Sequence, residues 1–441
     1  MKPDIYQKQL REISLWLYSN GTHYKTLIQY FANLLTLAYI IEPNYTISND
    51  KVDKEKILKE HVKVSDYVEL MNIKHEFSKV LLNGFREDLF YGYVYDSPNS
   101  FTIRKINPNY CKVSSVEDGI FNFAFDFSYF NSYKDELPNY PAEFTSKYNT
   151  YLSQGYSFRW QELDSKNTVC IKVNEDLEFP LPPFAGIFEA VLEIEDYKAL
   201  KSAKTEIGNY KMLVQKIPVR SDSDDNNDYL IDFDQAMLFH SRIEANLPEY
   251  IGLATTPMDV EDISFDKDRA DTDNVAEAMK MFYSEAGVSD MLFNPSEQGQ
   301  IGLSSSVKVD ESNMFKVLRQ IERWINRRFK QKGGVFKKWK IMMPKLTTIN
   351  QDDKFEKYLK AAQYGVPTKS LIAASLDLSP AEMINLNILE NDVFELNDKW
   401  IPLASSHTET GDAGRPEIDD DKKTDSGIKT KDKKANENKN K

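Results

Sequence analysis

Cysteine and histidine are scarce in this sequence. Its 441 residues include only two cysteines and five histidines. Two cysteines, Cys111 and Cys170, cannot build a disulfide framework, and two buried free thiols in a reducing compartment are favoured over a disulfide between them. The histidines are scattered, and neither His-Glu-x-x-His nor Cys-x-x-Cys occurs. A zinc site is therefore not expected.

Long apolar runs are missing as well. The longest apolar stretch, residues 31–41, contains Asn33 and Thr36 and falls far short of the roughly 20 residues that a membrane-spanning helix needs. The N-terminus, MKPDIYQKQL, lacks the apolar core of a secretory signal. We therefore expect a protein that is cytoplasmic where it is made and has no membrane partner.

The motifs that mark common enzyme classes are also absent. The sequence has no G-x-x-x-x-G-K-[ST] phosphate loop and no G-x-S-x-G nucleophile elbow, and its Gly-rich stretch at 299–302 lacks a lysine. Glu193 and Asp196 could in principle act as an acid–base pair, but no nucleophile accompanies them, and carboxylates on a long helix usually form a solvated face. We expect no catalytic residue and no cofactor.

One acidic segment imitates part of a calcium-binding loop. Asp222, Asp224 and Asn226 have the spacing of its first three ligands. However, Asn227 stands where the loop needs glycine, and Phe233 stands where it needs the closing glutamate. A solvated acidic loop is favoured, and no metal is expected.

Aromatic residues and negative charge are plentiful. The 24 tyrosines and 25 phenylalanines suit large contact surfaces as well as cores. The formal net charge of -13 argues against a general DNA-binding surface, whereas an acidic wall would let DNA slide past without sticking. The length indicates more than one structural unit.

Hydrophobic periodicity predicts an α+β fold. In the first part of the chain, apolar residues at helical spacing are followed by short runs rich in β-branched and aromatic residues. The predicted helices cover 3–40, with a break at 19–21, then about 64–87, and 141–154. The predicted strands cover 90–95, 101–106, 110–115 and 120–127 as a meander, with 159–163 and 168–173 as a further strand pair.

A proline cluster at 180–183 leads into a more helical part. The predicted helices there cover about 186–214, 232–246, 271–287, 305–330, 353–363, 368–376 and 380–397. A strand and a turn are predicted over 250–265, and strands are predicted over 339–343 and 346–349. An acidic loop (221–228) and a polar loop (288–304) lie between helices, and the composition from about 403 onward predicts a disordered tail.

Three local patterns sharpen this outline. Residues spaced by three and four along the 186–214 helix predict a narrow helix–helix seam, formed by Leu200, Ala203, Ile207, Tyr210 and Val214. Gly333 and Gly334 should stop the 305–330 helix. Ser379, Pro380 and Glu382 combine an N-cap, a first-turn proline and a capping-box acid.

The 305–330 helix carries a basic stripe. Arg319, Arg323 and Arg327 are four residues apart and should line one face. Surface ion pairs with nearby acids would explain them simply. Contact with an adjacent copy is favoured over contact with a DNA phosphate, because the chain as a whole is acidic.

The element order and several local phrases resemble the portal proteins of tailed bacteriophages, in particular a siphophage-type group from Gram-positive hosts. The phrases are Tyr18-Ser19-Asn20-Gly21, Tyr30-Phe31-Ala32-Asn33, Phe90-Tyr91-Gly92-Tyr93-Val94, Asn122-Phe123-Ala124-Phe125-Asp126, Asp196-Tyr197-Lys198-Ala199-Leu200, Gly414-Arg415-Pro416 and Thr424-Asp425-Ser426-Gly427. The resemblance covers roughly residues 15–430.

The resemblance implies a portal fold in eight segments. These are a wing of N-terminal helices and a β-rich part (1–185), a stem helix (186–216), a clip (217–265), a returning stem helix (266–287), a tunnel loop (288–304), a long helix with wing strands (305–350), a helical crown (351–402) and a disordered tail (403–441).

The resemblance also implies a role without catalysis. Twelve copies would form a ring at a capsid vertex, built in the host cytoplasm with major capsid and scaffolding proteins and retained in the virion. The ring would dock the large subunit of the packaging terminase first and a head–tail adaptor later. Double-stranded DNA would pass through it without sequence-specific contacts.

Two groups of candidate residues follow from the resemblance. The clip would dock its partners through Arg220, Asp222, Asp224 and Asp225. The tunnel loop would meet DNA through Asn294, Ser296, Gln298 and Gln300. Residues 288–304 contain no lysine or arginine, so contact with DNA there should be weak and independent of sequence.

Two alternatives remain open from the sequence. The chain could be another structural protein of a phage neck or baseplate. It could also be a metal-dependent nuclease that uses Asp222, Asp224, Asp266 and Asp268.

Overall fold

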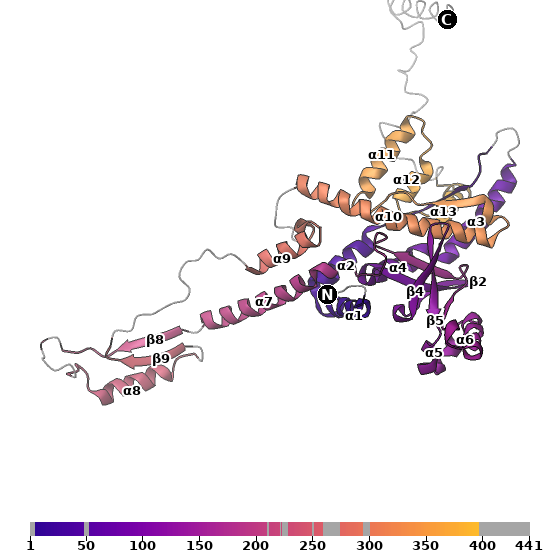
Figure 1. Cartoon of the computed structure of the whole chain (residues 1–441). Coiled ribbons are helices and arrows are strands. Elements are labelled where there is room, and N and C mark those ends of the chain that lie inside the picture. Colours follow the sequence, from indigo (N-terminus) through magenta and orange to yellow (C-terminus); the bar gives the residue numbers. More distant parts are fainter. Residues whose placement is uncertain are drawn as a thin grey trace, which may run out of the picture. The chain divides into compact units, whose positions relative to one another are not determined.

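The computed structural model describes residues 5–47, 53–209, 211–220, 222, 228–248, 251–258, 274–293 and 300–396 (Figure 1). The chain forms two compact units, residues 1–383 and 384–441. The first unit combines helices with antiparallel and parallel strand pairs, which confirms the predicted α+β class. In the second unit, the described residues include a π-helical turn, Leu389–Val393.

Four helices begin the first unit. They are α1 (Gln7–Asn20), α2 (Thr22–Leu34), α3 (Lys54–Met71) and α4 (Ile73–Glu87). The predicted break at 19–21 is confirmed, with Gly21 between α1 and α2. The single helix predicted over 64–87 is wrong, because Asn72 adopts a left-handed conformation (φ 44°) that separates α3 from α4. Helix α3 also begins earlier than predicted, where Asp53 accepts a hydrogen bond from the Lys56 N–H (3.1 Å).

Two three-stranded antiparallel sheets follow. One has the order β3–β2–β7, with β2 (Leu89–Ser97), β3 (Ser100–Lys105) and β7 (Thr168–Lys172). The other has the order β4–β5–β6, with β4 (Cys111–Glu117), β5 (Ile120–Asp126) and β6 (Trp160–Glu162). The four strands predicted over 90–127 are confirmed as β2 to β5, and the helix predicted over 141–154 is α6 (Ala142–Gln154).

The predicted strand pairing needs two corrections. The four strands do not form one meander, because β3 and β4 lie in different sheets. The segments 159–163 and 168–173 do not pair with each other either. Strand β6 pairs with β5, and β7 pairs with β2.

Aromatic side chains fill the core between these elements. One cluster is centred on fully buried rings, Phe123, Phe125, Phe127, Phe130 and Phe144. Cys111 and Cys170 are free thiols buried in the same cluster, as predicted. A second, larger cluster packs the first four helices against a later helix and includes Tyr24, Phe77 and Trp324.

The middle of the chain leaves this core and forms a β-α-β unit. Helix α7 (Phe188–Asn209) leads to β8 (Lys211–Lys216), α8 (Phe233–Glu244) and β9 (Ile251–Thr256). Strands β8 and β9 are parallel, and α8 lies along them (Figure 1). The chain returns through α9 (Asn274–Glu285), which packs against α7.

The helix predicted over 186–214 is therefore too long. It ends at Asn209, and Val214 lies in strand β8. Of the predicted seam residues, Leu200 is 65% exposed and Ala203 is also exposed, so neither is buried among the described residues. Tyr210 lies outside the described residues.

Helix α10 (Gln300–Lys332) is 33 residues long. It begins five residues before the predicted start at 305, so the last part of the predicted polar loop is helical. Gly333 and Gly334 end it with positive φ angles of 73° and 55°, as predicted. Strand β10 (Trp339–Met342) then pairs with β1 (Ile40–Pro43). The strand predicted over 346–349 is reduced to one isolated bridge between Leu35 and Thr347.

Three helices close the described chain. They are α11 (Gln351–Gln363), α12 (Lys369–Ser375) and α13 (Pro380–Ile388). The predicted capping box at the start of α13 is confirmed. The Ser379 N–H donates to Glu382 Oε2 (2.8 Å), and the Glu382 N–H donates to Ser379 Oγ (3.1 Å). Helix α13 ends before the predicted 397, and the predicted tail from 403 lies outside the described residues.

Short helical turns connect these elements. They are α5 (Tyr129–Ser132) and the 3₁₀ turns Pro108–Tyr110, Lys134–Asn139, Tyr156–Phe158, Ala185–Ile187, Asp290–Leu292 and Phe336–Lys338.

Candidate functional site

Helix α10 covers the outer edge of strand β7. The Gln320 side chain accepts a hydrogen bond from the Lys172 N–H (3.1 Å) and donates one to the Lys172 carbonyl (2.6 Å). Trp324 Nε1 donates to the Thr168 carbonyl (2.8 Å). These side chains satisfy backbone groups that a further strand would otherwise pair with. The basic end of α10 is thereby held against the loops that enter β7.

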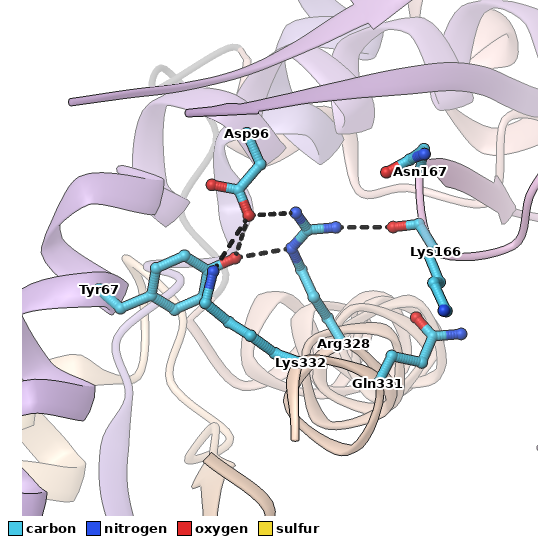
Figure 2. Close-up of a pocket in the computed structure, with 7 residues that line it drawn as sticks. All are labelled: Tyr67, Asp96, Lys166, Asn167, Arg328, Gln331 and Lys332. Atoms are coloured by element: carbon cyan, nitrogen blue, oxygen red, sulfur yellow. Dashed lines mark hydrogen bonds and ion pairs between the residues drawn. The ribbon is translucent and has the colours of Figure 1, made fainter. Parts of the chain in front are cut away.

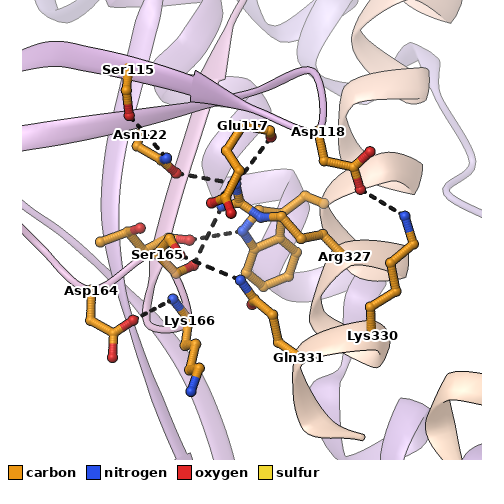
Figure 3. Close-up of polar contacts among 12 residues, drawn as sticks. Ser115, Glu117, Asp118, Asn122, Asp164, Ser165, Lys166, Arg327, Lys330 and Gln331 are labelled. Carbon is orange, nitrogen blue, oxygen red and sulfur yellow. Dashed lines mark hydrogen bonds and ion pairs between the residues drawn. The ribbon is translucent and has the colours of Figure 1, made fainter.

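Arg327 is buried where the basic end of α10 meets the β4–β5 hairpin and the loop before β7 (Figure 3). We call this place the α10 junction. Its guanidinium donates to Asn122 Oδ1 (3.1 Å) and to the carbonyls of Glu117 and Ser165 (both 3.4 Å), and it forms an ion pair with the Glu117 carboxylate (3.7 Å). Burial lowers the pKa of Arg327, and Glu117 counteracts that shift. These partners lie on the β4–β5 hairpin and in the loop before β7.

The neighbouring residues of the basic stripe lie differently. Arg323 is exposed, and its guanidinium lies so close to Gly119 that a Cβ there would be 2.4 Å from Nη2. Lys330 forms an ion pair with Asp118 (2.7 Å) on the same β4–β5 turn (Figure 3). Arg319 is exposed. The pairing of Arg319, Arg323 and Arg327 between subunits stays a prediction.

The helical geometry explains the difference between these arginines. A residue four positions along a helix is rotated by about 40°, and one eight positions along by about 80°. Arg319 and Arg327 thus do not share one face, contrary to the prediction from their spacing. The rotation carries Arg327 under the β4–β5 hairpin, while Arg319 stays in solvent.

A polar pocket lies next to the α10 junction (Figure 2). The Arg328 guanidinium donates to Tyr67 Oη (2.8 Å), to the Lys166 carbonyl (2.8 Å) and to Asp96 Oδ2 (2.6 Å). Lys332 Nζ lies 3.4 Å from the same Asp96 oxygen and 3.9 Å from the centre of the Tyr67 ring. The pocket has a volume of about 140 Å³, with Asn167 and Gln331 completing its lining.

The charges set the electrostatics of this pocket. Burial alone would raise the pKa of Asp96, but hydrogen bonds from Arg328 and Tyr67 outweigh it and hold that pKa below its ordinary value. Burial raises the pKa of Tyr67 to about 12. Asp96 is thus ionised and Tyr67 neutral at physiological pH. The pocket offers fixed positive charge and hydrogen-bond donors, which suit an anionic group.

A buried ion pair fixes the segment that leads into α7. Asp88 accepts hydrogen bonds from the backbone N–H groups of Asn174 (2.8 Å) and Leu181 (3.1 Å), and Lys172 Nζ lies 3.8 Å from its carboxylate. The Lys172 ammonium also donates to the Leu177 carbonyl. Burial raises the pKa of Asp88 to about 6, although its hydrogen bonds and Lys172 oppose the shift.

The predicted clip and tunnel-loop residues are only partly within the described chain. Arg220 and Asp222 are exposed, and the Arg220 N–H donates to the Asp228 carbonyl (2.9 Å). Asp224 and Asp225 lie outside the described residues, as do Asn294, Ser296 and Gln298. Gln300 is the first residue of α10.

The segment before the predicted tunnel loop is anchored by aromatic contacts. Phe293 stacks on Tyr283 of α9 with ring centroids 4.3 Å apart, and Tyr30 of α2 meets the Phe293 ring edge-on (5.5 Å). Tyr30 Oη donates to Asp310 Oδ2 (3.0 Å) on α10. Tyr30 of α2 thus contacts both Phe293 and Asp310.

Among the described residues, no group of three or more His, Cys, Asp and Glu side chains is placed to hold a metal ion. Asp266 and Asp268, considered for a nuclease, lie outside the described part of the chain. Within the described residues, no helix is both long and apolar enough to cross a membrane.

Sequence reasoning missed the Arg328 pocket, although a signal was present. Arg328 is seven residues after Ile321 and three after Ile325, so it lies on the apolar stripe that faces the core. A cationic residue in such a position predicts a buried anionic or hydrogen-bonding partner. Nothing in the local sequence identifies Asp96 as that partner.

Comparisons with known proteins give a remote likeness among solved structures. No family model matches this chain, and no curated protein matches it. Among solved structures, it is similar to a chain from a structure described as the virion of a native gene transfer agent particle. That match has a TM-score of 0.42 and 11% sequence identity, and it covers 85% of this chain and 94% of the other. Neither the score nor the identity is high enough to transfer a role from that particle to this chain.

Proposed function

We propose that this chain is the subunit of a portal ring at the capsid vertex of a tailed bacteriophage. Copies of it surround a channel for double-stranded DNA. The ring docks the packaging terminase during assembly and a head–tail adaptor afterwards, and it performs no catalysis. It is assembled in the host cytoplasm with capsid and scaffolding proteins and remains in the virion.

The order of elements carries this proposal. The chain leaves a helical and β-rich body through α7, forms a separate β-α-β unit, and returns through α9, which packs on α7. It then passes a short polar segment and enters a 33-residue helix before the C-terminal helices. This order is similar to the stem, clip, stem, tunnel loop, long helix and crown of portal proteins.

Exposed apolar residues on α7 support assembly into an oligomer. Val191 and Ile194 are buried near the start of this helix, whereas Leu192, Tyr197 and Leu200 are 48%, 39% and 65% exposed. Apolar side chains gathered along an exposed helix favour contact with another protein surface. In a ring, identical helices from adjacent copies supply that surface.

The charge of the chain favours a channel through which DNA moves freely over a site that binds DNA tightly. Its net charge is -13, and residues 288–304 contain two acids, Asp290 and Glu297, but no lysine or arginine. Tight duplex binding needs several cationic contacts to phosphates. DNA moving past this segment should therefore meet polar groups such as Asn294 and Gln298 and bind weakly, without sequence preference.

Native mass spectrometry and electron microscopy of the purified full-length protein test the proposal. We expect rings of about twelve copies with an open channel when viewed along the axis, and binding of the ring to the terminase large subunit. A protein that stays monomeric alone and with capsid and scaffolding proteins would contradict the proposal.

The same preparation separates the alternatives. Rings of another copy number that do not bind terminase would point to a neck or baseplate protein. DNA cleavage that depends on Mg²⁺ or Mn²⁺, and that is lost in Asp222→Asn or Asp266→Asn, would point to a nuclease.

A further inference from the structure

Two adjacent pockets form one groove beside strand β2. The first is the pocket lined by Arg328, and the second has a volume of about 340 Å³ and is lined by Tyr95 and Pro141 among others. Asp96 and Asn167 line both. We call the combined feature the β2 groove. One end is cationic, and the other is aromatic and apolar.

Part of the β2 edge is open along this groove. Pairing of β2 with β7 ends at Tyr93 and Thr168, and the next bond on that side runs from the Val94 N–H to the Asn167 carbonyl (2.7 Å). Backbone groups alternate between the two edges of a strand, so the N–H and C=O of Asp96 face the same side as those of Val94. Within the described residues, no strand pairs with β2 there. Such an edge is a template for an added strand.

The cationic end has more positive than negative charge. Three cationic side chains, Arg328, Lys332 and Lys166, line the pocket with one carboxylate, Asp96. Arg328 and Lys332 both contact Asp96 Oδ2. The Lys166 side chain is exposed, and its ammonium makes no hydrogen bond or ion pair within the described residues. A second carboxylate would reduce this net positive charge.

The aromatic end holds an unsatisfied polar atom. Tyr95 Oη is buried and has no hydrogen-bond partner among the described residues. Buried hydroxyl groups in folded proteins usually have a partner. A donor or acceptor on a bound segment would provide one with a small shift of the phenol.

From these features we infer that the β2 groove binds an extended acidic segment of another protein chain. The segment adds as a short strand to the β2 edge at Asp96 and places a carboxylate between Lys166 and Lys332. Its apolar neighbours lie toward Tyr95 and Pro141. This inference goes beyond the portal proposal and does not depend on it.

A protein segment fits the groove better than duplex DNA does. Affinity for DNA comes from several phosphate contacts spread along the helix. Here the cations are confined to one small pocket, and acidic residues lie close by, Asp164 next to Lys166 and Asp118 next to Lys330. The open backbone edge, in turn, offers hydrogen bonds that a peptide can use and a duplex cannot.

Peptide binding to the full-length protein tests the inference. The probe is a fluorescein-labelled, capped pentapeptide, Thr-Val-Asp-Val-Thr, and its twin has Asn in place of Asp. Fluorescence anisotropy at low salt should show the acidic probe binding at least about tenfold more tightly than the twin. Lys166→Glu should weaken the acidic probe by about tenfold or more. Lys316→Glu, the same charge change at an exposed position of α10, should leave affinity within about twofold.

Hydrogen exchange covers the case in which a neighbouring copy already fills the groove. The amide of Asp96 should be protected about tenfold by the acidic probe, or should already be protected in the assembled protein and be released by Lys166→Glu. Equal affinity for the two probes, combined with fast exchange at the Asp96 amide that neither probe nor assembly slows, overturns the inference. If a DNA duplex binds in a way that requires Lys166 and the peptide does not bind, the pocket is assigned to nucleic acid and the inference is overturned.

Discussion

The β-rich body and the β-α-β unit of this chain are built from similar residues but are buried to different extents. In the body, Phe123 and Phe125 of β5 are completely buried. In the β-α-β unit, Met212 of β8 and Phe233 of α8 are 70% and 63% exposed. Among the described residues of 211–258, only Ile217 and Ala236 are buried. The body closes its own core, whereas the described residues of the β-α-β unit do not.

Sheet geometry gives a reason for this difference. Parallel strands in proteins are normally covered on both faces. The β8–β9 pair has one helix, α8, and the described residues provide no second layer. Contacts within one chain should therefore be enough to stabilise the body. The stability of the β-α-β unit should depend on contacts with partners.

The largest expected effect comes from a substitution in the core of the body. Phe125→Ala removes a fully buried ring and should lower the free energy of unfolding by about 3–5 kcal/mol. Phe239→Ala, at a half-exposed position of α8, should cost less than about 0.5 kcal/mol in the unassembled chain. Urea denaturation of the two variants measures both. Equal losses would show that the β-α-β unit has a core of its own.

The second effect concerns the buried ion pair that fixes the segment before α7. Lys172→Met leaves the Asp88 carboxylate buried without its cation and should cost about 3 kcal/mol. This loss of unfolding free energy is small for a broken buried ion pair, because the Asp88 carboxylate can become neutral by taking up a proton. Adding Asp88→Asn to this variant removes the charge and should recover part of the loss. Failure of the double variant to recover would mean that Lys172 acts through packing.

A smaller effect of the same pair appears in the pH dependence of unfolding. The pKa of Asp88 is raised to about 6 in the folded chain, above its value of about 4 in an unfolded chain. The stability from its bound proton is complete below about pH 4 and is lost as pH rises through about 6. Between pH 5 and 7, wild type should lose about 1 kcal/mol relative to Asp88→Asn. Parallel curves for the two proteins would contradict the shift.

The smallest effect on stability should come from the acidic loop of the β-α-β unit. Replacing Asp222, Asp224 and Asp225 by Ala should change the free energy of unfolding by less than about 0.5 kcal/mol and leave ring formation intact. Docking of the terminase or the head–tail adaptor should weaken, because the loop belongs to the proposed clip. Pull-down of each partner by the purified ring measures this, and unchanged packaging and neck assembly would remove the loop from the docking surface.

Features set by a few neighbouring residues could be predicted from the sequence. The capping box at Ser379 and the stop at Gly333 depend on contacts within one helical turn, and both were predicted correctly. The left-handed turn at Asn72 is also local, but apolar residues continue across it at helical spacing and conceal the break. The same happens at Val214, whose spacing fits a helix although it lies in β8.

Features set by distant residues could not be predicted in this way. The segments of β6 and β7 are correctly located, yet their partners β5 and β2 depend on how the two sheets share the aromatic core. The candidate site shows the same limit. The basic character of α10 is visible in the sequence, but Arg327 and Arg328 are bonded to Asn122 and Asp96, more than two hundred residues earlier.

The bonds between Gln320 and Lys172 have a consequence for biosynthesis. Their partners are 148 residues apart, which takes a ribosome about 7–30 s to translate. During that interval the β3–β2–β7 sheet can form, but the outer edge of β7 has no cover and could pair with a sheet from another nascent chain. The body of this protein should therefore be most prone to aggregation midway through its synthesis, and a chaperone that shields β7 until α10 emerges should raise the yield of folded chains.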